Sequence, residues 1–360
     1  MEVTHWKPAA RCLPALIFAV VTGCSPSDGA VRSLPTALRS DAREREGDGS
    51  LVARDLGSFG GVGARLFAIN DKGQGAGLVV LASGDIHALF RDATGIATDL
   101  GTMGGTISTA RGMNQRGVVV GGTRDASDVE HPFLWTTETG VVDLGSLGGV
   151  RGRAQSVNRS GHVVGFSFTA QGARHPFYWS RERGMVDLLG DPGARGIANA
   201  INDDDEVVGS VRFSDRVSHA FRWTPRTGFT DLGTLGFDSA SANAISGEGV
   251  IVGDVVTGGH GLAFRLSREG ELAVLSLPAG FANASPTSIN DRGDIVGIGY
   301  DDPFNVLEAE IWRRDGRVTR LPWNGPISLA TWITERGAVA GEAVTPSFGD
   351  HAVIWTPVDR

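Results

Sequence analysis

Residues 196–233 read GIANAINDDDEVVGSVRFSDRVSHAFRWTPRTGFTDLG, and this stretch contains the pattern that decides the fold. The pair Ile201-Asn202 opens a polar turn, and a short apolar segment that ends at Gly209 follows it. The segment His219–Trp223 alternates aromatic and other residues, as strands do, and Phe229–Gly233 has the composition of a further short strand. Together with the apolar residues before Ile201, the stretch predicts four short β-strands.

The same pattern recurs along the chain at a fixed spacing of 44 residues. An apolar residue followed by a polar turn residue occurs in this register at Ile69-Asn70, Met113-Asn114, Val157-Asn158, Ile201-Asn202, Ile245-Ser246, Ile289-Asn290 and Ile333-Thr334. A fixed period of about 20–50 residues indicates a repeat architecture, and four strands per unit of this length are typical of a propeller blade. We therefore predict an all-β fold, a seven-bladed β-propeller of four-stranded blades.

The two ends of the repeat array predict how the propeller closes. The last unit ends after its third strand, whereas Leu51–Gly57 has the sequence of a fourth strand without three strands before it. We expect this N-terminal strand to complete the last blade, because closure removes exposed sheet edges. The alternative is an open β-solenoid, which needs atypical capping units at its ends.

Small residues recur five positions before each apolar turn residue and favour the closed arrangement, because blades crowd together near the axis. They are Ala64, Ser108, Gly152, Gly196, Ala240, Ala284 and Ser328.

The third strand of five units begins with a histidine. These histidines are His87, His131, His175, His219 and His351. Because they belong to five different blades, they cannot converge on one metal ion, and we predict that each bonds a neighbouring strand or loop. The tripeptide His219-Ala220-Phe221 and its variants resemble the family of extracellular repeats named after His-Ala-Phe, over Asp55 to Trp355. The resemblance implies this architecture and export, and it implies no reaction.

The first residues of the chain have the pattern of an export signal. Lys7 and Arg11 precede an apolar run at 13–21, which is too short to span a bilayer. The run ends in Val21-Thr22-Gly23-Cys24, which resembles the lipobox of bacterial lipoproteins, and the alternative is a plain secretory signal. The resemblance implies a lipid on Cys24. Serine at position 25 implies sorting to the outer membrane, on its periplasmic or its outer face.

These patterns divide the chain into three predicted parts. Residues 1–23 form a lipoprotein signal peptide, residues 24–49 a flexible polar tether, and residues 50–360 the propeller. The formal net charge of −8 argues against a nucleic-acid partner, whose binding proteins usually carry a basic patch. We find no zinc, phosphate-loop or nucleophile motif, so we predict no metal and no cofactor, and we expect a monomer.

Four arginines are candidate ligand-binding residues. Arg65, Arg111, Arg153 and Arg195 belong to the first strands of units one to four or to the turns before them. In a propeller these positions converge near the axis, where the guanidinium groups would bind an anionic ligand. The alternative is four separate arginines that are solvated or paired with acids.

A second group of candidates interrupts the repeat in the last two units. Tyr300, Asp301 and Asp302 belong to the longest variable loop, Trp323 to the turn before the last unit, and Trp332 to a position that is otherwise Ala, Gly or Ser. Aromatic residues beside acids suit a glycan-binding or peptide-binding surface. For Trp332, core filling is an equal alternative.

Two classes of function fit these features. The favoured one is a binding or scaffold module of the cell envelope, whose partner is an envelope or extracellular protein, peptide or glycan. The alternative is an exported enzyme that cleaves a polysaccharide or a peptide with loop acids such as Asp301 or Asp350. We expect the enzyme's site on the upper face of the propeller, which carries the loops between second and third strands. A close pair of carboxylates in a cleft of that face would favour the enzyme, and a shallow face without a perturbed titratable group would favour the binding module.

Overall fold

The computed structural model describes residues 51–301, 306–347 and 349–358. Within these ranges the chain forms 28 β-strands and no helix, which confirms the predicted all-β class. Accordingly, none of the described segments is a helix able to cross a membrane. The predicted signal peptide, the lipidation of Cys24 and the tether lie outside the described residues.

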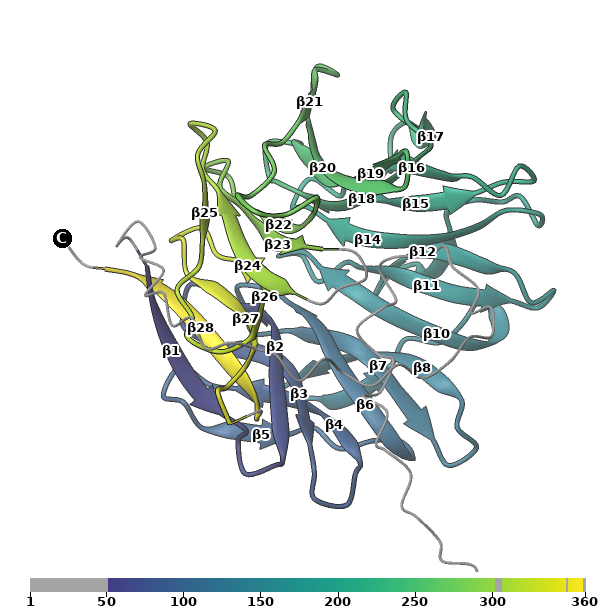
Figure 1. Cartoon of the computed structure of the whole chain (residues 1–360). Helices are drawn as coiled ribbons and strands as arrows, with labels where there is room; N and C mark the ends of the chain where they lie inside the picture. Colours follow the sequence, from purple (N-terminus) through teal and green to yellow (C-terminus); the bar gives the residue numbers. More distant parts are fainter. Residues whose placement is uncertain (1–50, 302–305, 348, 359–360) are drawn as a thin grey trace, which may run out of the picture. The chain divides into compact units, whose positions relative to one another are not determined.

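Each repeat unit folds into an antiparallel sheet whose strands follow one another in chain order (Figure 1). Three units form separate four-stranded sheets: β10 (Gly148–Val157), β11 (Val163–Thr169), β12 (Arg174–Ser180) and β13 (Gly184–Asp187); β14 (Arg195–Ile201), β15 (Val207–Arg212), β16 (Ser218–Thr224) and β17 (Gly228–Gly233); β18 (Ser239–Ile245), β19 (Ile251–Thr257), β20 (His260–Leu266) and β21 (Leu272–Val274).

The other units have the same internal order. They are β2 (Gly63–Ile69), β3 (Gly75–Val80), β4 (Ile86–Arg91) and β5 (Ala97–Asp99); β6 (Gly104–Met113), β7 (Val119–Asp125), β8 (Glu130–Thr136) and β9 (Gly140–Asp143); β22 (Asn283–Ile289), β23 (Ile295–Tyr300), β24 (Leu307–Trp312) and β25 (Val318–Arg320); β26 (Ile327–Ile333), β27 (Val339–Val344) and β28 (Asp350–Pro357).

Single parallel pairs connect the third strand of one unit to the first strand of the next. Ile86 of β4 pairs with Ile107 of β6, and Leu307 of β24 pairs with Ile327 of β26. A pair of the same kind joins Gly63 of β2 to Asp350 of β28, so the first and last units are in contact.

The N-terminal strand β1 (Leu51–Gly57) pairs with β28 and lies beside it in Figure 1. Its register places Asp55 opposite Val353, just as Asp143 of β9 lies opposite Phe133 of β8. Strand β1 therefore occupies the position that a fourth strand has in the other units, although it comes from the other end of the repeat array.

The recurrent turn asparagines connect neighbouring units by a ladder of hydrogen bonds. Each Nδ2 donates to the carbonyl oxygen of the corresponding residue in the next unit, over 2.8 to 3.2 Å. The donors are Asn70, Asn114, Asn158, Asn202 and Asn290. Because each turn also bonds its own asparagine, the same residue closes the hairpin and sets the spacing between units.

The small residues of the first strands are buried where two units meet. At Ser108 and Gly152, the choice of small residue depends on whether the third strand of the preceding unit offers a backbone N–H there. Ser108 accepts a hydrogen bond from the Ala88 backbone N–H, whereas Gly152 makes room for Pro132, which has no N–H to donate. Serine therefore stands opposite a backbone N–H, and glycine stands opposite a proline.

The recurrent histidines have the structural role that the repeat predicts. In five units the histidine Nδ1 lies 2.7 to 3.0 Å from the carboxylate of the fourth-strand aspartate. The pairs are His87–Asp99, His131–Asp143, His175–Asp187, His219–Asp231 and His351–Asp55. These contacts join the third strand to the fourth in these five units, and the last pair includes β1.

Candidate functional site

Three of the predicted arginines lie close together on neighbouring first strands. Arg65 of β2 and Arg153 of β10 occupy the same repeat position, whereas Arg111 of β6 lies two positions further along its strand. Arg111 is the extra residue of a β-bulge, because the register of β6 with β7 shifts between Ala110 and Gly112. A bulge redirects the side chain of its extra residue. We call Arg65, Arg111 and Arg153 the arginine cluster.

Two members of the arginine cluster are paired with carboxylates. The Nε of Arg65 lies 2.7 Å from Oε2 of Glu342, and the Nε of Arg153 lies 2.5 Å from Oε1 of Glu130. Gly122 makes room for the second pair, because a Cβ at this position would lie 2.6 Å from the Glu130 carboxylate. Both arginines are therefore compensated within the protein.

Arg111 has no such compensation. Its guanidinium lies 4.5 Å from the centre of the Phe67 ring, a cation–π contact, and its buried Nε has no hydrogen-bond partner among the described residues. Burial, and next to it the charge of Arg153, lower the pKa of Arg111 to about 9, which still leaves the side chain protonated at neutral pH. An uncompensated, partly buried cation is an unusual feature in a folded protein.

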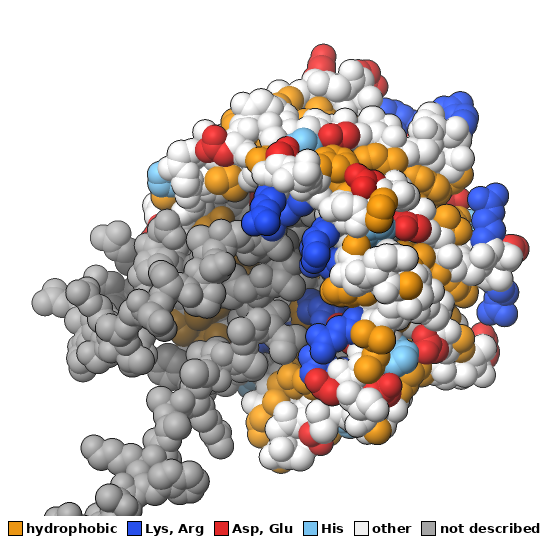
Figure 2. Space-filling view, turned by 90° about the vertical axis from the view of Figure 1, so that its right-hand side faces the viewer, with side chains coloured by type: hydrophobic (Ala, Val, Ile, Leu, Met, Phe, Trp, Pro, Cys, Tyr) orange, Lys and Arg blue, Asp and Glu red, His pale blue; other side chains and the backbone are white. Residues whose placement is uncertain are grey.

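Further arginines extend the basic surface toward the next unit. Arg153 and Arg174 both approach the Phe166 ring, at 6.0 and 5.6 Å from its centre. Burial and the charges of Arg212 and Arg195 lower the pKa of Arg174, so Arg195 lies near this second group. Figure 2 shows several Lys and Arg side chains gathered near the middle of one face. Sequence reasoning missed Arg174, which the repeat places one position before a recurrent histidine.

An acidic pair adjoins the arginine cluster at Arg65. Asp350 of β28 lies 3.9 Å from a second nitrogen of Arg65, whose Nε binds Glu342 of β27. Burial raises the pKa of Glu342 to about 7, against the opposing charge of Arg65 and with a smaller contribution from the charge of Asp350. A carboxyl group that titrates near neutral pH beside a second carboxylate is a frequent feature of catalytic sites.

A second pair of acids lies in the unit of β22–β25. The tripeptide Glu308-Ala309-Glu310 stands where other units have His-Ala-Phe or a variant of it, and Glu310 is fully buried. Arg320 replaces the fourth-strand aspartate, and its Nε lies 2.7 Å from Glu308 and 3.5 Å from Glu310. Burial and the charge of Glu308 raise the pKa of Glu310 to about 9. The departure from His-Ala-Phe is the sequence signal for this pair, and our sequence reasoning did not use it.

The aromatic candidates of the last two units are mainly core residues. Tyr300 is buried in a hydrophobic cluster with Leu307 and Leu329, so it is not the surface aromatic that we expected. Trp332 packs partly buried against two hydrophobic clusters, one shared by the last and first units and one shared by the first and second units, which is the core-filling alternative. Trp323 is partly buried, and its Nε1 donates a hydrogen bond of 2.9 Å to the Val344 carbonyl oxygen.

The two acidic candidates of the variable loop contribute little to this picture. Asp301 is partly buried, and Asp302 lies outside the described residues. In the part of the chain that the structure describes, no group of three or more His, Cys, Asp or Glu side chains is arranged to hold a metal ion. The arginine cluster and the two acidic pairs remain as groupings of charged side chains, and outside them burial raises the pKa of Asp254 to about 6.

Comparisons with known proteins find similar folds and no similar sequences. No protein-family model matches the chain, and no curated protein sequence matches it significantly. The β-propeller domain of the Trilobed protease from Pyrococcus furiosus superimposes with a TM-score of 0.60 at 11% identity, covering 81% of this chain and 95% of that domain. A streptogramin B lyase superimposes with a TM-score of 0.52 at 12% identity, covering 86% of this chain and 98% of the lyase.

TolB from Acinetobacter baumannii is a third similar structure, with a TM-score of 0.51 at 15% identity. The match covers 70% of this chain and 64% of TolB, so it leaves more than a third of TolB unmatched. Identities this low carry information on fold and none on ligand or reaction. Together with the four-stranded antiparallel units, these similarities show that the described chain has a β-propeller fold.

Proposed function

We propose that this chain is an exported binding module of the cell envelope that recognises an anionic ligand at the arginine cluster. The observation that carries the proposal is the state of Arg111, which has a buried Nε without an acceptor and forms no ion pair with an acid among the described residues. A buried charged donor without a partner costs free energy, and an incoming carboxylate, sulfate or phosphate group removes that cost.

The neighbours of Arg111 support an anionic ligand rather than a cationic one. Arg65 and Arg153 lower the pKa of Arg111, so both contribute positive potential at this position. Glu342 and Glu130 act in the opposite direction, but each is held by its own arginine at 2.7 and 2.5 Å. An anion at Arg111 would therefore lie beside the ion pairs Arg65–Glu342 and Arg153–Glu130, while Arg111 itself forms no ion pair with a described residue.

The proposed architecture is a seven-bladed propeller that β1 closes, and it acts as a monomer. Two hydrogen bonds between the last unit and the first support closure. The Thr331 hydroxyl donates to the Leu66 carbonyl oxygen at 2.9 Å, and the Arg336 backbone N–H donates to Asp71 at 3.1 Å. The pairing of β1 with β28 supports the same arrangement.

The proposed location is the outer membrane, with the chain anchored by a lipid on Cys24 and facing the periplasm or the exterior. The lipobox-like Val21–Cys24 and the resemblance to His-Ala-Phe repeats support this location. Its partner would be an envelope or extracellular protein, peptide or glycan that carries an anionic group. Mass spectrometry of the mature N-terminus tests the anchor, and an unmodified N-terminus beyond Cys24 would refute it.

An array of anionic and neutral glycans and peptides, probed with the full chain, tests the binding function. Arg111→Gln should weaken binding to the anionic members by about tenfold or more, because a charge-assisted hydrogen bond contributes about 1.5–3 kcal/mol. The matched control is Arg314→Gln, since Arg314 is an exposed arginine in the turn after β24. Equal binding by Arg111→Gln and the control would contradict the proposal.

A second candidate function is cleavage of a polysaccharide or a peptide, and the acidic pair Glu342 and Asp350 favours it. A carboxyl group with a pKa near 7 is suited to donate a proton while a neighbouring carboxylate remains ionised. Release of reducing ends or new amino groups from polysaccharide and peptide mixtures is the assay. If the chain is such an enzyme, Glu342→Gln should lower the rate about 100-fold or more. Absence of any product release by the unmodified chain would eliminate this candidate.

A further inference from the structure

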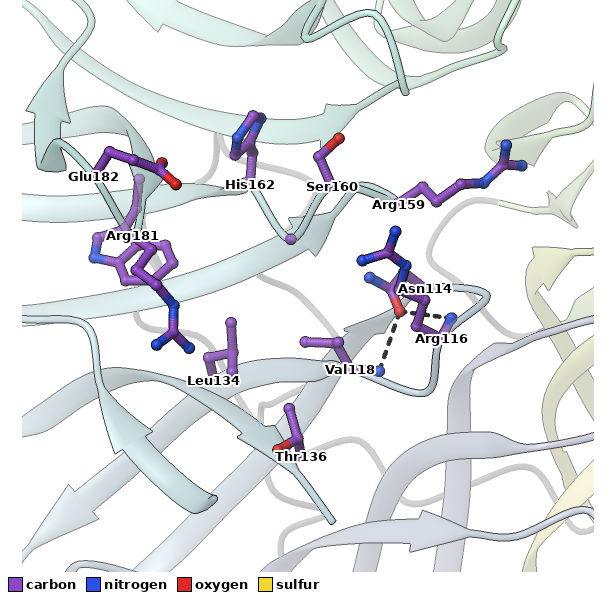
Figure 3. Close-up of a pocket in the computed structure, with 12 residues that line it drawn as sticks. Asn114, Arg116, Val118, Leu134, Thr136, Arg159, Ser160, His162, Arg181 and Glu182 are labelled. Atoms are coloured by element: carbon purple, nitrogen blue, oxygen red, sulfur yellow. Dashed lines mark hydrogen bonds between the residues drawn. The ribbon is translucent and has the colours of Figure 1, made fainter. Parts of the chain in front are cut away.

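A pocket of about 210 Å³ lies between two neighbouring hairpin turns, the β6–β7 turn and the β10–β11 turn. The first turn contributes Asn114, Arg116 and Val118, and the second contributes residues 159–162. Strands β8 and β12 and the turn after β12 supply the remaining wall. Figure 3 shows the residues that line this pocket.

The pocket lies beside the rung of the ladder in which Asn114 donates to the Asn158 carbonyl oxygen over 2.8 Å, and the residues that follow the two asparagines bond other units. Gln115 bonds backward to Asp71, donating from Nε2 over 3.1 Å and accepting from the Asp71 N–H over 3.2 Å. Arg159 bonds forward to Asp203, whose carboxylate accepts from its N–H over 2.7 Å. Gln115 and Arg159 occupy corresponding turn positions, and because each is bonded to a unit on the far side, neither side chain bridges the pocket.

The side chains beneath the turns are also smaller here than in the following units. Leu134 stands where the next two units have Tyr178 and Arg222. Tyr178 fills its place with aromatic contacts on both sides, at 5.3 Å from His162 and 5.3 Å from Trp223. Arg222 fills its place with an ion pair to Glu206 at 2.5 Å. Leu134 leaves this volume open.

Two exposed arginines without an ion-pair partner among the described residues flank the opening. Arg116 and Arg181 lie on opposite sides of the space above Leu134 and Val118 (Figure 3). The other charged groups of the pocket are already engaged. His162 binds Asp205 at 2.6 Å and Arg159 binds Asp203, so neither competes for a ligand.

The single acid of the pocket lining, Glu182, is also held locally. Hydrogen bonds from its own backbone N–H and from the Ser180 hydroxyl lower its pKa, so it is ionised at neutral pH. The neighbouring charges of His162 and Arg181 lower this pKa further. The pocket thus combines an apolar floor, the Trp179 wall and an excess of guanidinium groups.

We infer that this pocket binds a sugar ring that carries a carboxylate, such as a hexuronic acid residue. A guanidinium group suits a carboxylate, which accepts bidentate hydrogen bonds from arginine, and the pocket offers such a group on either side. Leu134, Val118 and Trp179 suit the C–H face of a ring. The volume is below the range of about 300–1,000 Å³ for drug-sized ligands, so it fits one ring of this size. This site is separate from the arginine cluster.

Isothermal titration of the full chain with glucuronate, glucose and acetate tests the inference. Glucuronate should bind, and glucose and acetate should each bind at least about tenfold more weakly. Glucose lacks the carboxylate that the arginines bind, and acetate lacks the ring that packs on the apolar floor. Arg181→Gln should weaken glucuronate binding by about tenfold. Arg226→Gln, an exposed arginine in the corresponding turn of the next unit, should leave the affinity within about twofold.

Leu134→Tyr tests the volume independently of charge. Tyrosine is the residue that the next unit has at this position, so it should fill the pocket and abolish glucuronate binding at an unchanged melting temperature. Acetate that binds as tightly as glucuronate would reduce the pocket to a simple anion site and overturn the inference. Glucuronate binding that survives both Arg181→Gln and Leu134→Tyr would overturn it as well.

Discussion

At the scale of single residues, the departures from the repeat carry most of the chemistry. Glu310 replaces a buried phenylalanine of the His-Ala-Phe pattern, and Arg111 occupies a bulge position where Asn199 and Thr287 of other units bond a neighbouring backbone carbonyl oxygen. A buried phenylalanine needs only space, whereas a buried glutamate must stay protonated or find a cation. These substitutions therefore create titratable groups inside a framework that is otherwise apolar.

Glu310 should make the stability of the protein depend on pH. Its pKa is about 9 in the folded chain and about 4.5 when unfolded, so folding favours the protonated acid. The stabilising contribution of protonation is complete below pH 4.5 and decreases by about 1.4 kcal/mol per pH unit as the pH rises to 9.

Glu310→Gln removes this dependence, because glutamine stays neutral. Urea unfolding at pH 5, 7 and 9 should show that the variant gains stability relative to the unmodified chain as the pH rises. A constant difference between the two proteins over this range would show that Glu310 does not titrate in this way.

Glu342 should make anion binding at the arginine cluster stronger at acidic pH. Its pKa of about 7 means that it is mostly ionised at pH 8 and mostly protonated at pH 6. Protonation removes a negative charge beside Arg65, which favours an anion by about 1 kcal/mol, or about fivefold in affinity. Titration of an anionic array ligand at both pH values measures this ratio. With Glu342→Gln the ratio should fall to about one, and a ratio that persists would assign the pH dependence to another group.

At the scale of strands, two facing positions on the third and fourth strands change their residue types together from one unit to another. The third-strand histidine and fourth-strand aspartate are paired in five units. In the β18–β21 unit the two positions hold Leu262 and Val274, and in the β22–β25 unit they hold Glu308 and Arg320. Each pair is complementary in itself, because the two side chains project from adjacent strands on the same face.

Strand β1 should be essential for stability, whereas the predicted tether should not. Deleting 50–57 removes the pairing with β28, the Asp55 partner of His351 and the buried Leu51 side chain. It also exposes the edge of β28, whose backbone groups lose their partners. Thermal melts should show a decrease of about 10 °C or more for this deletion and little change for deletion of 25–46. Equal melting temperatures would contradict the proposed role of β1.

At the scale of the whole molecule, the decisive contacts join the last repeat unit to the first. Thr331 and Thr287 occupy the same repeat position and make the same two hydrogen bonds. Each hydroxyl shares its proton between two carbonyl oxygens, one in its own unit and one in the next first strand, which for Thr331 is Leu66 of β2 and for Thr287 is Ala330 of β26. In a closed ring the two threonines are equivalent.

Closure can be tested with this matched pair of threonines. If the ring is closed in solution, Thr331→Val and Thr287→Val should each lower the free energy of unfolding by about 1 kcal/mol, because each removes one partly buried hydroxyl donor with little change in the volume of the side chain. In an open array Thr331 would face water instead of Leu66. Urea unfolding of both variants distinguishes the cases, and a neutral Thr331→Val beside a destabilising Thr287→Val would refute closure.

Sequence alone determined the strands, the turns and their period, and the tertiary structure decided which charges are compensated. The turn asparagines and the alternation of apolar residues act over a few neighbouring residues, so they can be read along the chain. The partners of Arg65 and Arg153 come from other units, Glu342 and Glu130, and no local pattern pairs them. Tyr300 is polar enough for a surface, but packing against Leu307 and Leu329 buries it. Compensation and burial depend on distances between residues far apart in the chain, which only the folded arrangement of the units establishes.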